Sequence, residues 1–348
     1  MFTIHRALPV IIVCLAASLN VFAQRQTQNP LWDRSTALQT VDKTQVMVSL
    51  KPMYEMARSG NEAGLLSVLS ELKSDPGLSD PARDYVVYKF TLGLGDMETD
   101  AVSQAVIGWL SSYQPATLVA HEDHPRHAVP LFNVRAAAQG VGNGWERQKA
   151  AVEAERILEE APGQFISAYL DASPSGQRGF LDALETISTE QSAELGRLAL
   201  EHLAISPGLT LVAARASIKS GEMELLRRSV ALGEGPGLAR ALKEAAAGLS
   251  AEETAVLLNY VMELESDSKA ALAIAQLVPG NLDNPAVRDL MFKTLTNQTL
   301  GASAALVLGS STDPEIQSRL SEIAGGEEGL EKQRAQLATR FKSAGRVD

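Results

Sequence analysis

The sequence contains one cysteine, Cys14, and that residue lies in the N-terminal apolar segment. A chain from which this segment is removed can form no disulfide bond. Large exported proteins can manage without disulfides, because a chain of about 300 residues buries roughly 75% of the surface exposed by its unfolded form. The scarcity of cysteine therefore agrees better with a bacterial periplasm than with an animal extracellular space.

Aromatic residues and clustered positive charge are also scarce. Only 5% of the residues are Phe, Trp or Tyr, which is few for a protein that must stack bases or sugars. The formal net charge is −11, and loss of Arg6 with the N-terminal segment makes it −12. Because a surface this acidic repels phosphate backbones and no block of basic residues offsets it, we expect no nucleic-acid binding.

Motifs of the common catalytic and cofactor sites are absent. No Gly-x-Ser-x-Gly motif occurs, which excludes the nucleophile elbow of α/β hydrolases. The stretch Gly140-Val141-Gly142-Asn143-Gly144 follows a predicted helix rather than a strand. It also lacks the lysine and the glycine spacing of nucleotide-binding loops, so we interpret it as a turn that ends a helix. The sequence predicts no cofactor.

Residues 1–23 have the features of a cleavable signal peptide. Arg6 supplies a positive charge, Ala7 to Leu19 is almost continuously apolar, and Val21-Phe22-Ala23 carries small or β-branched residues where a signal peptidase cuts. The apolar run is shorter than the ~20 residues of a membrane-spanning helix. We predict cleavage after Ala23, a periplasmic mature protein, and no transmembrane segment after cleavage.

Helical periodicity runs through most of the remaining chain. N-terminal caps are predicted at Asp80-Pro81, Asn284-Pro285 and Asp313-Pro314, and a capping box at Ser250 and Glu253. No segment of comparable length alternates with period two, so the sequence predicts an all-α fold. Apolar residues recur every three or four positions in Glu62 to Leu72, Arg83 to Leu94, Trp145 to Glu160, Ala193 to Leu203, Glu222 to Leu232, Glu252 to Leu264 and Ala286 to Leu295.

The predicted helices repeat at a regular spacing. Asn284-Pro285 and Asp313-Pro314 are 29 residues apart. One helix pair cannot bury its own apolar face, so pairs of this length are expected to stack on one another. The pattern predicts an α-solenoid of stacked antiparallel helix pairs. Small-residue segments that start 29 to 32 residues apart supply the close contacts: Leu211 to Ile218, Ala241 to Ala247, Ala270 to Ala275 and Ala302 to Leu308.

The C-terminal part resembles a known family. Asn284-Pro285-Ala286-Val287-Arg288, then Ala302 to Gly309, then Asp313-Pro314 are similar to the Asp-Pro-x-Val-Arg and alanine-rich pattern of HEAT-type, armadillo-like repeats. The resemblance is clearest over residues 284–340. The chain departs from the pattern at Asn284, which replaces the usual Asp, and after Asp313-Pro314, where the Arg is missing. The resemblance implies a curved surface that binds other proteins, and it implies no catalytic residues.

The segment 111–130 interrupts the helical pattern. We therefore divide the chain into a signal peptide (1–23), an N-terminal helical region (24–110), a long histidine-containing loop (111–130) and HEAT-like repeats (131–345). Loops longer than ~15 residues in compact domains are usually functional or disordered.

Three histidines lie within seven residues of this loop, together with two acidic residues. Imidazoles and carboxylates are ligands of zinc and related metals. However, the His-Glu-Asp-His spacing is one residue short of the helical zinc motif, and Pro125 disfavours helical geometry at the preceding histidine. We therefore favour a hydrogen-bonded polar loop without bound metal. The candidate metal ligands are His121, His124, His127 and Asp123, and the candidate binding residues are Glu122 and Arg126.

Three functions remain open. The sequence favours a non-catalytic exported scaffold that binds a protein partner in the cell envelope. One alternative is an all-helical enzyme that acts on envelope polysaccharide, for which Tyr85, Tyr88 and Trp109 are the nearest aromatic candidates. The other alternative is a metal-binding protein that uses the histidines of residues 121–127.

Overall fold

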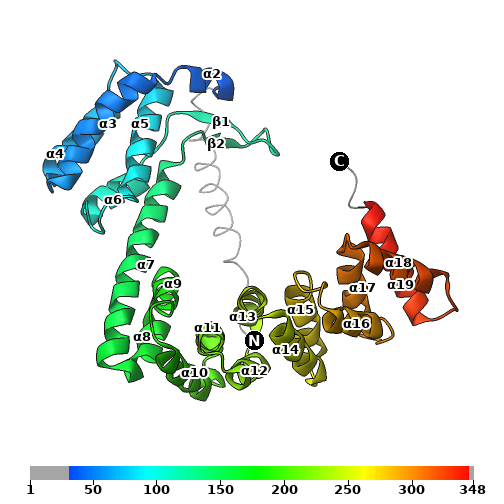
Figure 1. The fold of residues 1–348 in the computed structure, drawn as a ribbon. Coiled ribbons are helices and arrows are strands. Elements are labelled where there is room, and N and C mark those ends of the chain that lie inside the picture. Colours follow the sequence, from blue (N-terminus) through cyan, green and yellow to red (C-terminus); the bar gives the residue numbers. More distant parts are fainter. Residues whose placement is uncertain (1–30, 345–348) are drawn as a thin grey trace, which may run out of the picture. The chain divides into compact units, whose positions relative to one another are not determined.

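The computed structural model describes the backbone of residues 31–344 and the side chains of residues 31–340. The described chain contains 18 α-helices, two 3-10 helices and one two-stranded antiparallel ribbon (Figure 1). The predicted all-α class is thus confirmed. None of the described helices combines the length and apolar character needed to cross a lipid bilayer. The predicted signal peptide lies outside the described residues.

The chain divides into two compact units, residues 1–148 and 149–348. The boundary falls inside a helix, α7 (Val134–Glu160), rather than after the predicted loop at residue 130. The segment 111–130 therefore belongs to the first unit.

The first unit is built around α3, which packs against α4 and α5, while α4 contacts α6. Its core contains Leu50 and Met53 of α3, Leu69 of α4, Phe90 of α5 and Leu110 of α6, all almost fully buried. The elements are α2 (Arg34–Gln39), α3 (Lys43–Arg58), α4 (Glu62–Leu72), α5 (Asp80–Leu94), α6 (Gln104–Ser112), β1 (Leu118–Ala120), β2 (Ala128–Pro130) and α7 (Val134–Glu160).

The N-terminal cap of α5 differs from the prediction. The Ser79 hydroxyl accepts a hydrogen bond from the backbone N–H of Ala82, and Asp80 and Pro81 are already helical. Serine caps a helix as well as aspartate does, and Asp80 in the first turn still faces the positive end of the helix dipole. The predicted helix start is therefore displaced by one residue.

The prediction that residues 140–144 end a helix is wrong. These residues lie inside α7, which runs unbroken for 27 residues. Val141 and Trp145 are one turn apart, and both are buried in the core of the first unit. Each intervening glycine costs about 1 kcal/mol relative to alanine in a helix. Burial of two large side chains offsets that cost, so tertiary packing overrides the local glycine signal.

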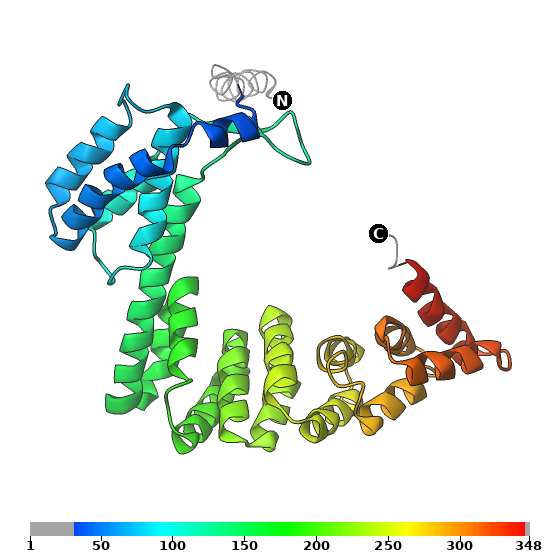
Figure 2. The same cartoon turned by 45° about the horizontal axis from the view of Figure 1, so that its top comes forward.

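The second unit consists of short helices that follow one another in a row (Figure 2, green to red). Its elements are η1 (Pro162–Gln164), α8 (Phe165–Asp171), α9 (Pro174–Ala183), α10 (Thr189–Leu203), η2 (Pro207–Leu209), α11 (Thr210–Ser220), α12 (Met223–Leu232), α13 (Gly235–Gly248), α14 (Ala251–Glu263), α15 (Asp267–Leu277), α16 (Pro285–Thr294), α17 (Gly301–Ser310), α18 (Pro314–Gly325) and α19 (Leu330–Ala344).

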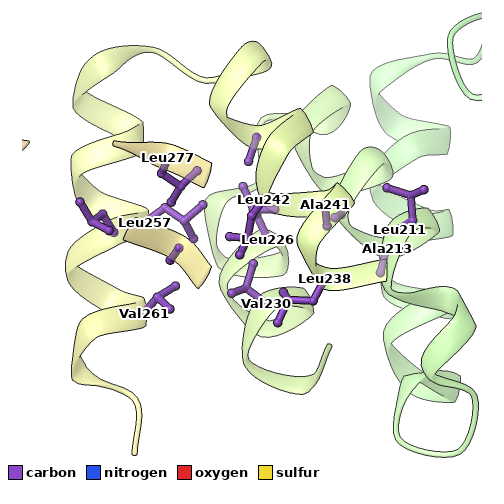
Figure 3. Close-up of a cluster of buried hydrophobic side chains, with 14 of the residues drawn as sticks. Leu211, Ala213, Leu226, Val230, Leu238, Ala241, Leu242, Leu257, Val261 and Leu277 are labelled. Atoms are coloured by element: carbon purple, nitrogen blue, oxygen red, sulfur yellow. The ribbon is translucent and has the colours of Figure 1, made fainter. Parts of the chain in front are cut away.

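Many helices of the second unit contact a sequence neighbour and also a helix two places away. One set of contacts joins α10 to α12, α12 to α14 and α14 to α16, which we call the even row. The other joins α11, α13, α15, α17 and α19 in succession, which we call the odd row. Side chains of both rows meet in a continuous apolar core, which contains Leu226 and Leu257 of the even row and Leu242 of the odd row (Figure 3).

All four predicted small-residue segments lie in the odd row, in α11, α13, α15 and α17. Ala213, Ala241, Ala273 and Ala304 are fully buried there. Their small side chains let neighbouring backbones approach closely. Arg215 of α11 adds polar links within this region, because it binds the Glu244 carboxylate of α13 through two nitrogens and donates a hydrogen bond to the Leu181 carbonyl of α9.

The predicted caps of the second unit are confirmed. Asn284 and Asp313 accept hydrogen bonds from backbone N–H groups at the starts of α16 and α18. Ser250 and Glu253 form the complete capping box of α14. Gly221 ends α11 with φ at 72°, a left-handed conformation that glycine adopts without steric cost. Local sequence signals therefore define many of these helix ends.

Candidate functional site

The segment 111–130 is more ordered than the predicted loop. Residues 118–120 and 128–130 of this segment pair as the antiparallel strands β1 and β2, with Val119 opposite Val129. The pair is tied to its surroundings, because the Trp32 N–H donates a 2.8 Å hydrogen bond to the Leu118 carbonyl and Val119 is buried. The ribbon therefore presents the histidine residues on a turn with a defined backbone.

A buried carboxylate anchors the chain that leads into this ribbon. Asp84 of α5 is almost completely buried. One of its oxygens accepts a 2.7 Å hydrogen bond from the Tyr113 hydroxyl, and the other accepts a 2.7 Å bond from the Thr117 backbone N–H. Because a buried carboxylate is costly without partners, this arrangement fixes residues 113–117 against α5.

The same contact makes stability depend on pH at the alkaline end. Burial and the neighbouring Asp84 carboxylate raise the pKa of the Tyr113 hydroxyl above its usual value. The unfolded chain releases this proton near pH 10, whereas the folded chain retains it, so stability falls as pH rises above about 10. Burial also raises the pKa of Tyr54 and Tyr169.

Tyr113→Phe is therefore expected to make the alkaline loss of stability shallower without abolishing it. Urea unfolding of both proteins at about pH 8 and about pH 11 measures the difference. Equal losses in the wild type and the variant would contradict the assignment to Tyr113.

The turn between the strands is closed by backbone hydrogen bonds among the histidines. The His121 N–H donates to the His127 carbonyl, and the His127 N–H donates to the His124 carbonyl. The Asp123 N–H donates to Nδ1 of His121. Glu122 forms an ion pair with Arg34 of α2, which links the turn to that helix.

The three imidazole rings lie next to one another. The centroids of His121 and His124 are 5.5 Å apart with the rings stacked at 28°, and those of His124 and His127 are 5.8 Å apart at 42°. Lone pairs of imidazole lie in the ring plane, so rings that lie face to face do not direct their nitrogens at one point. Within the described residues no group of three or more His, Cys, Asp or Glu is arranged to hold a metal ion.

Alanine replacement of His124 is expected to change the free energy of unfolding by about 0.5 kcal/mol or less, because the side chain is exposed and makes only ring contacts. Untagged protein is expected to retain no zinc, copper or nickel after dialysis. Elemental analysis and urea unfolding measure both outcomes. Stoichiometric metal that is retained by the wild type and lost in His124→Ala would contradict this prediction.

The aromatic residues considered for an enzyme pack against other rings. Tyr85 and Tyr88 contact Phe132, with ring centroids 5.0 and 5.9 Å apart, and Trp109 contacts Tyr113 at 5.5 Å. Asp84, the buried carboxylate beside them, is occupied by two hydrogen bonds. This arrangement stabilises the first unit and offers no paired carboxylates for acid and base catalysis.

A groove in the second unit is a candidate that the sequence did not reveal. It has a volume of about 520 Å³ and lies between α10 and the end of α7. We call it the α10 groove. Its walls come from segments some 30 residues apart, so no local motif marks it. The lining residues are Leu158, Glu159, Pro162, Gly163, Gln191, Glu194, Leu195, Arg197, Leu198 and Glu201.

No family model, no curated protein and no solved structure matches the chain. The resemblance of residues 284–340 to HEAT-type repeats therefore stays a prediction from the sequence.

Proposed function

We propose that the chain is a non-catalytic, exported helical-repeat scaffold of the HEAT-like α-solenoid type that binds a protein partner in the cell envelope. The observation that carries this proposal is the double row of the second unit, in which helices two places apart in the sequence contact one another from α10 to α16 and from α11 to α19. Stacking of this kind is the packing rule of solenoids, which expose long faces suited to binding extended partners.

The two rows differ in charge, which supports separate binding faces. Helices α11, α13 and α15 of the odd row together contain five Lys and Arg residues and two Asp and Glu residues. Helices α10, α12 and α14 of the even row together contain seven acidic residues and three Lys and Arg residues. Opposite charge on the two rows would orient a charged partner, because electrostatic complementarity mainly sets association rate and orientation.

Export is the second part of the proposal, and it predicts processing. Mature protein recovered from the source cell is expected to begin at Gln24, because the small Ala23 occupies the last position before the predicted cut. N-terminal sequencing of protein from the envelope fraction measures this. Recovery of an intact Met1, or of a lipid on Cys14, would contradict the predicted export route.

Partner binding is tested by affinity capture of the mature protein from its own cell envelope after mild cross-linking. We expect to recover a protein in constant proportion to the bait. An excess of untagged mature chain should displace this protein from the bait. Repeated captures without such a protein would overturn the scaffold proposal. Release of soluble saccharides from purified envelope polysaccharide by the mature chain would do the same, because it would identify an enzyme.

A further inference from the structure

The α10 groove lies where the even row begins. On one side of α10, Gly196 approaches Leu225 of α12, and a Cβ atom there would lie 3.4 Å from that leucine. Leu198 is two residues further along, which is about 200° around the helix. Leu198 therefore faces away from α12 and into the groove. One side of α10 is therefore covered by α12, and the opposite side lines the open groove.

The short helix α8 does not line the α10 groove. α8 has seven residues, and it packs mainly on α9, η1 and η2. α10 has 15 residues and packs mainly on α11, α12 and η2. In the rest of the even row each helix meets a helix of ten residues or more from the next pair. The groove is thus a position in the row that the described chain leaves without a full helix.

The groove combines an apolar floor with an acidic rim. Leu158 and Leu195 form buried parts of the floor, and Leu198 is half-buried. Its one basic residue, Arg197, is paired with Glu222, the residue that precedes α12. Three carboxylates on the rim form no hydrogen bond or ion pair within the described part of the chain: Glu159, Glu194 and Glu201.

The length and backbone of α10 favour a helical occupant. The lining residues from Gln191 to Glu201 extend over ten helical steps, which is about 15 Å or three turns. A helix satisfies its own backbone hydrogen bonds, whereas an extended segment would need free backbone groups that the helical wall does not offer. Two packed helices lie 8–10 Å apart with their ridges interlocked.

From these observations we infer that the α10 groove receives an amphipathic helix of a partner protein, apolar on one side and bordered by Lys or Arg, which extends the even row by one helix. This inference rests on the proposed scaffold function and specifies its partner. The apolar side of the incoming helix covers Leu158, Leu195 and Leu198. Its basic residues lie opposite Glu159, Glu194 and Glu201.

Fluorescence anisotropy with designed peptides of about 18 residues tests this inference on the full mature chain. The probe is a helical peptide with Leu at heptad a and d positions and Lys beside them. Two comparison peptides have Glu in place of every Lys, or two central prolines that break the helix. We expect the Lys peptide to bind saturably. We expect both comparison peptides to bind about tenfold more weakly or not at all.

Protein variants locate the binding. Leu198→Gln keeps helix propensity and removes apolar surface from the floor, and the double variant Glu194→Lys, Glu201→Lys reverses the rim. Each is expected to weaken binding about tenfold. Glu263→Lys is the matched control, because Glu263 is an exposed glutamate in the last turn of α14, as Glu201 is in α10, and neither forms an ion pair with another described residue. Circular dichroism verifies that each variant remains folded.

Several results would overturn the inference. Equal binding of the proline peptide would exclude a helical ligand. Equal weakening by Glu263→Lys would show general attraction to an acidic chain. A self-association that Glu201→Lys abolishes would assign the groove to a second copy. If capture from the envelope recovers a partner and the Leu198→Gln variant recovers it equally well, the inference fails while the scaffold proposal stands.

Discussion

Replacement of Asp84 by alanine is expected to lower the free energy of unfolding by about 3 kcal/mol. The change leaves the Tyr113 hydroxyl and the Thr117 N–H buried without their acceptor. Hydrogen bonds to a charged group contribute about 1.5–3 kcal/mol each, and relief from burying the carboxylate offsets part of the combined loss. Urea unfolding of the variant measures the difference.

The effect is expected to be local to the ribbon and α5. Hydrogen exchange at the amides of Thr117 and Val119 should accelerate in Asp84→Ala, because these residues lose the anchor that holds them to the helix. Asp84→Asn provides a graded control, since its amide oxygen can still accept one of the two bonds. A variant Asp84→Ala as stable as the wild type would show that the cost of burying the carboxylate cancels its hydrogen bonds.

The anchor also shows why the sequence did not predict the ribbon. β1 and β2 have three residues each, which is too short for a period-two pattern. Their stability depends on Asp84, some 30 residues earlier in the chain, and on Trp32. Neither contact is visible in the local sequence. The break in helical periodicity located the segment, and the long-range contacts determined its structure.

Helix positions in the second unit were predictable because their signals are local. Asn284, Asp313 and the Ser250 capping box place helix starts within one or two residues of the motif. The alanine-rich segments marked the helices that pack closely in the odd row. Local sequence signals gave the wrong helix end where tertiary packing opposed them. In residues 140–144, burial of Val141 and Trp145 keeps α7 continuous.

The candidate sites show the same difference between local signals, which the sequence reveals, and long-range packing, which it does not. The sequence identified the three histidines as neighbours, and the structure places the ring centroids of His121 and His127 each within 6 Å of that of His124. The orientation of the rings depends on the turn that the ribbon closes, so it could not be read from spacing. The α10 groove is lined by the end of α7, by η1 and by α10, and such a combination leaves no motif.

The other large expected effect concerns the core that joins the two rows. Leu242 of α13 is fully buried in the apolar cluster that also contains Leu226 of α12 and Leu257 of α14 (Figure 3). Its replacement by alanine removes three carbon atoms and leaves a cavity, so we expect a loss of about 2–5 kcal/mol in the free energy of unfolding. Leu306→Ala is the matched control, because Leu306 on α17 is 50% exposed and should cost less than about 1 kcal/mol.

The proposed solenoid architecture predicts which helices the Leu242→Ala replacement destabilises. In a quasi-one-dimensional array each helix pair is stabilised mainly by its neighbours, so a weakened interface opens the adjoining helices first. Hydrogen exchange should therefore accelerate in α11, α12, α13 and α15, the helices in contact around the site. Exchange in α3 and α5 of the first unit should remain unchanged, because their core contains no residue of α13. Equal acceleration throughout the chain would show that both units unfold as one cooperative block and would contradict a repeat-by-repeat architecture.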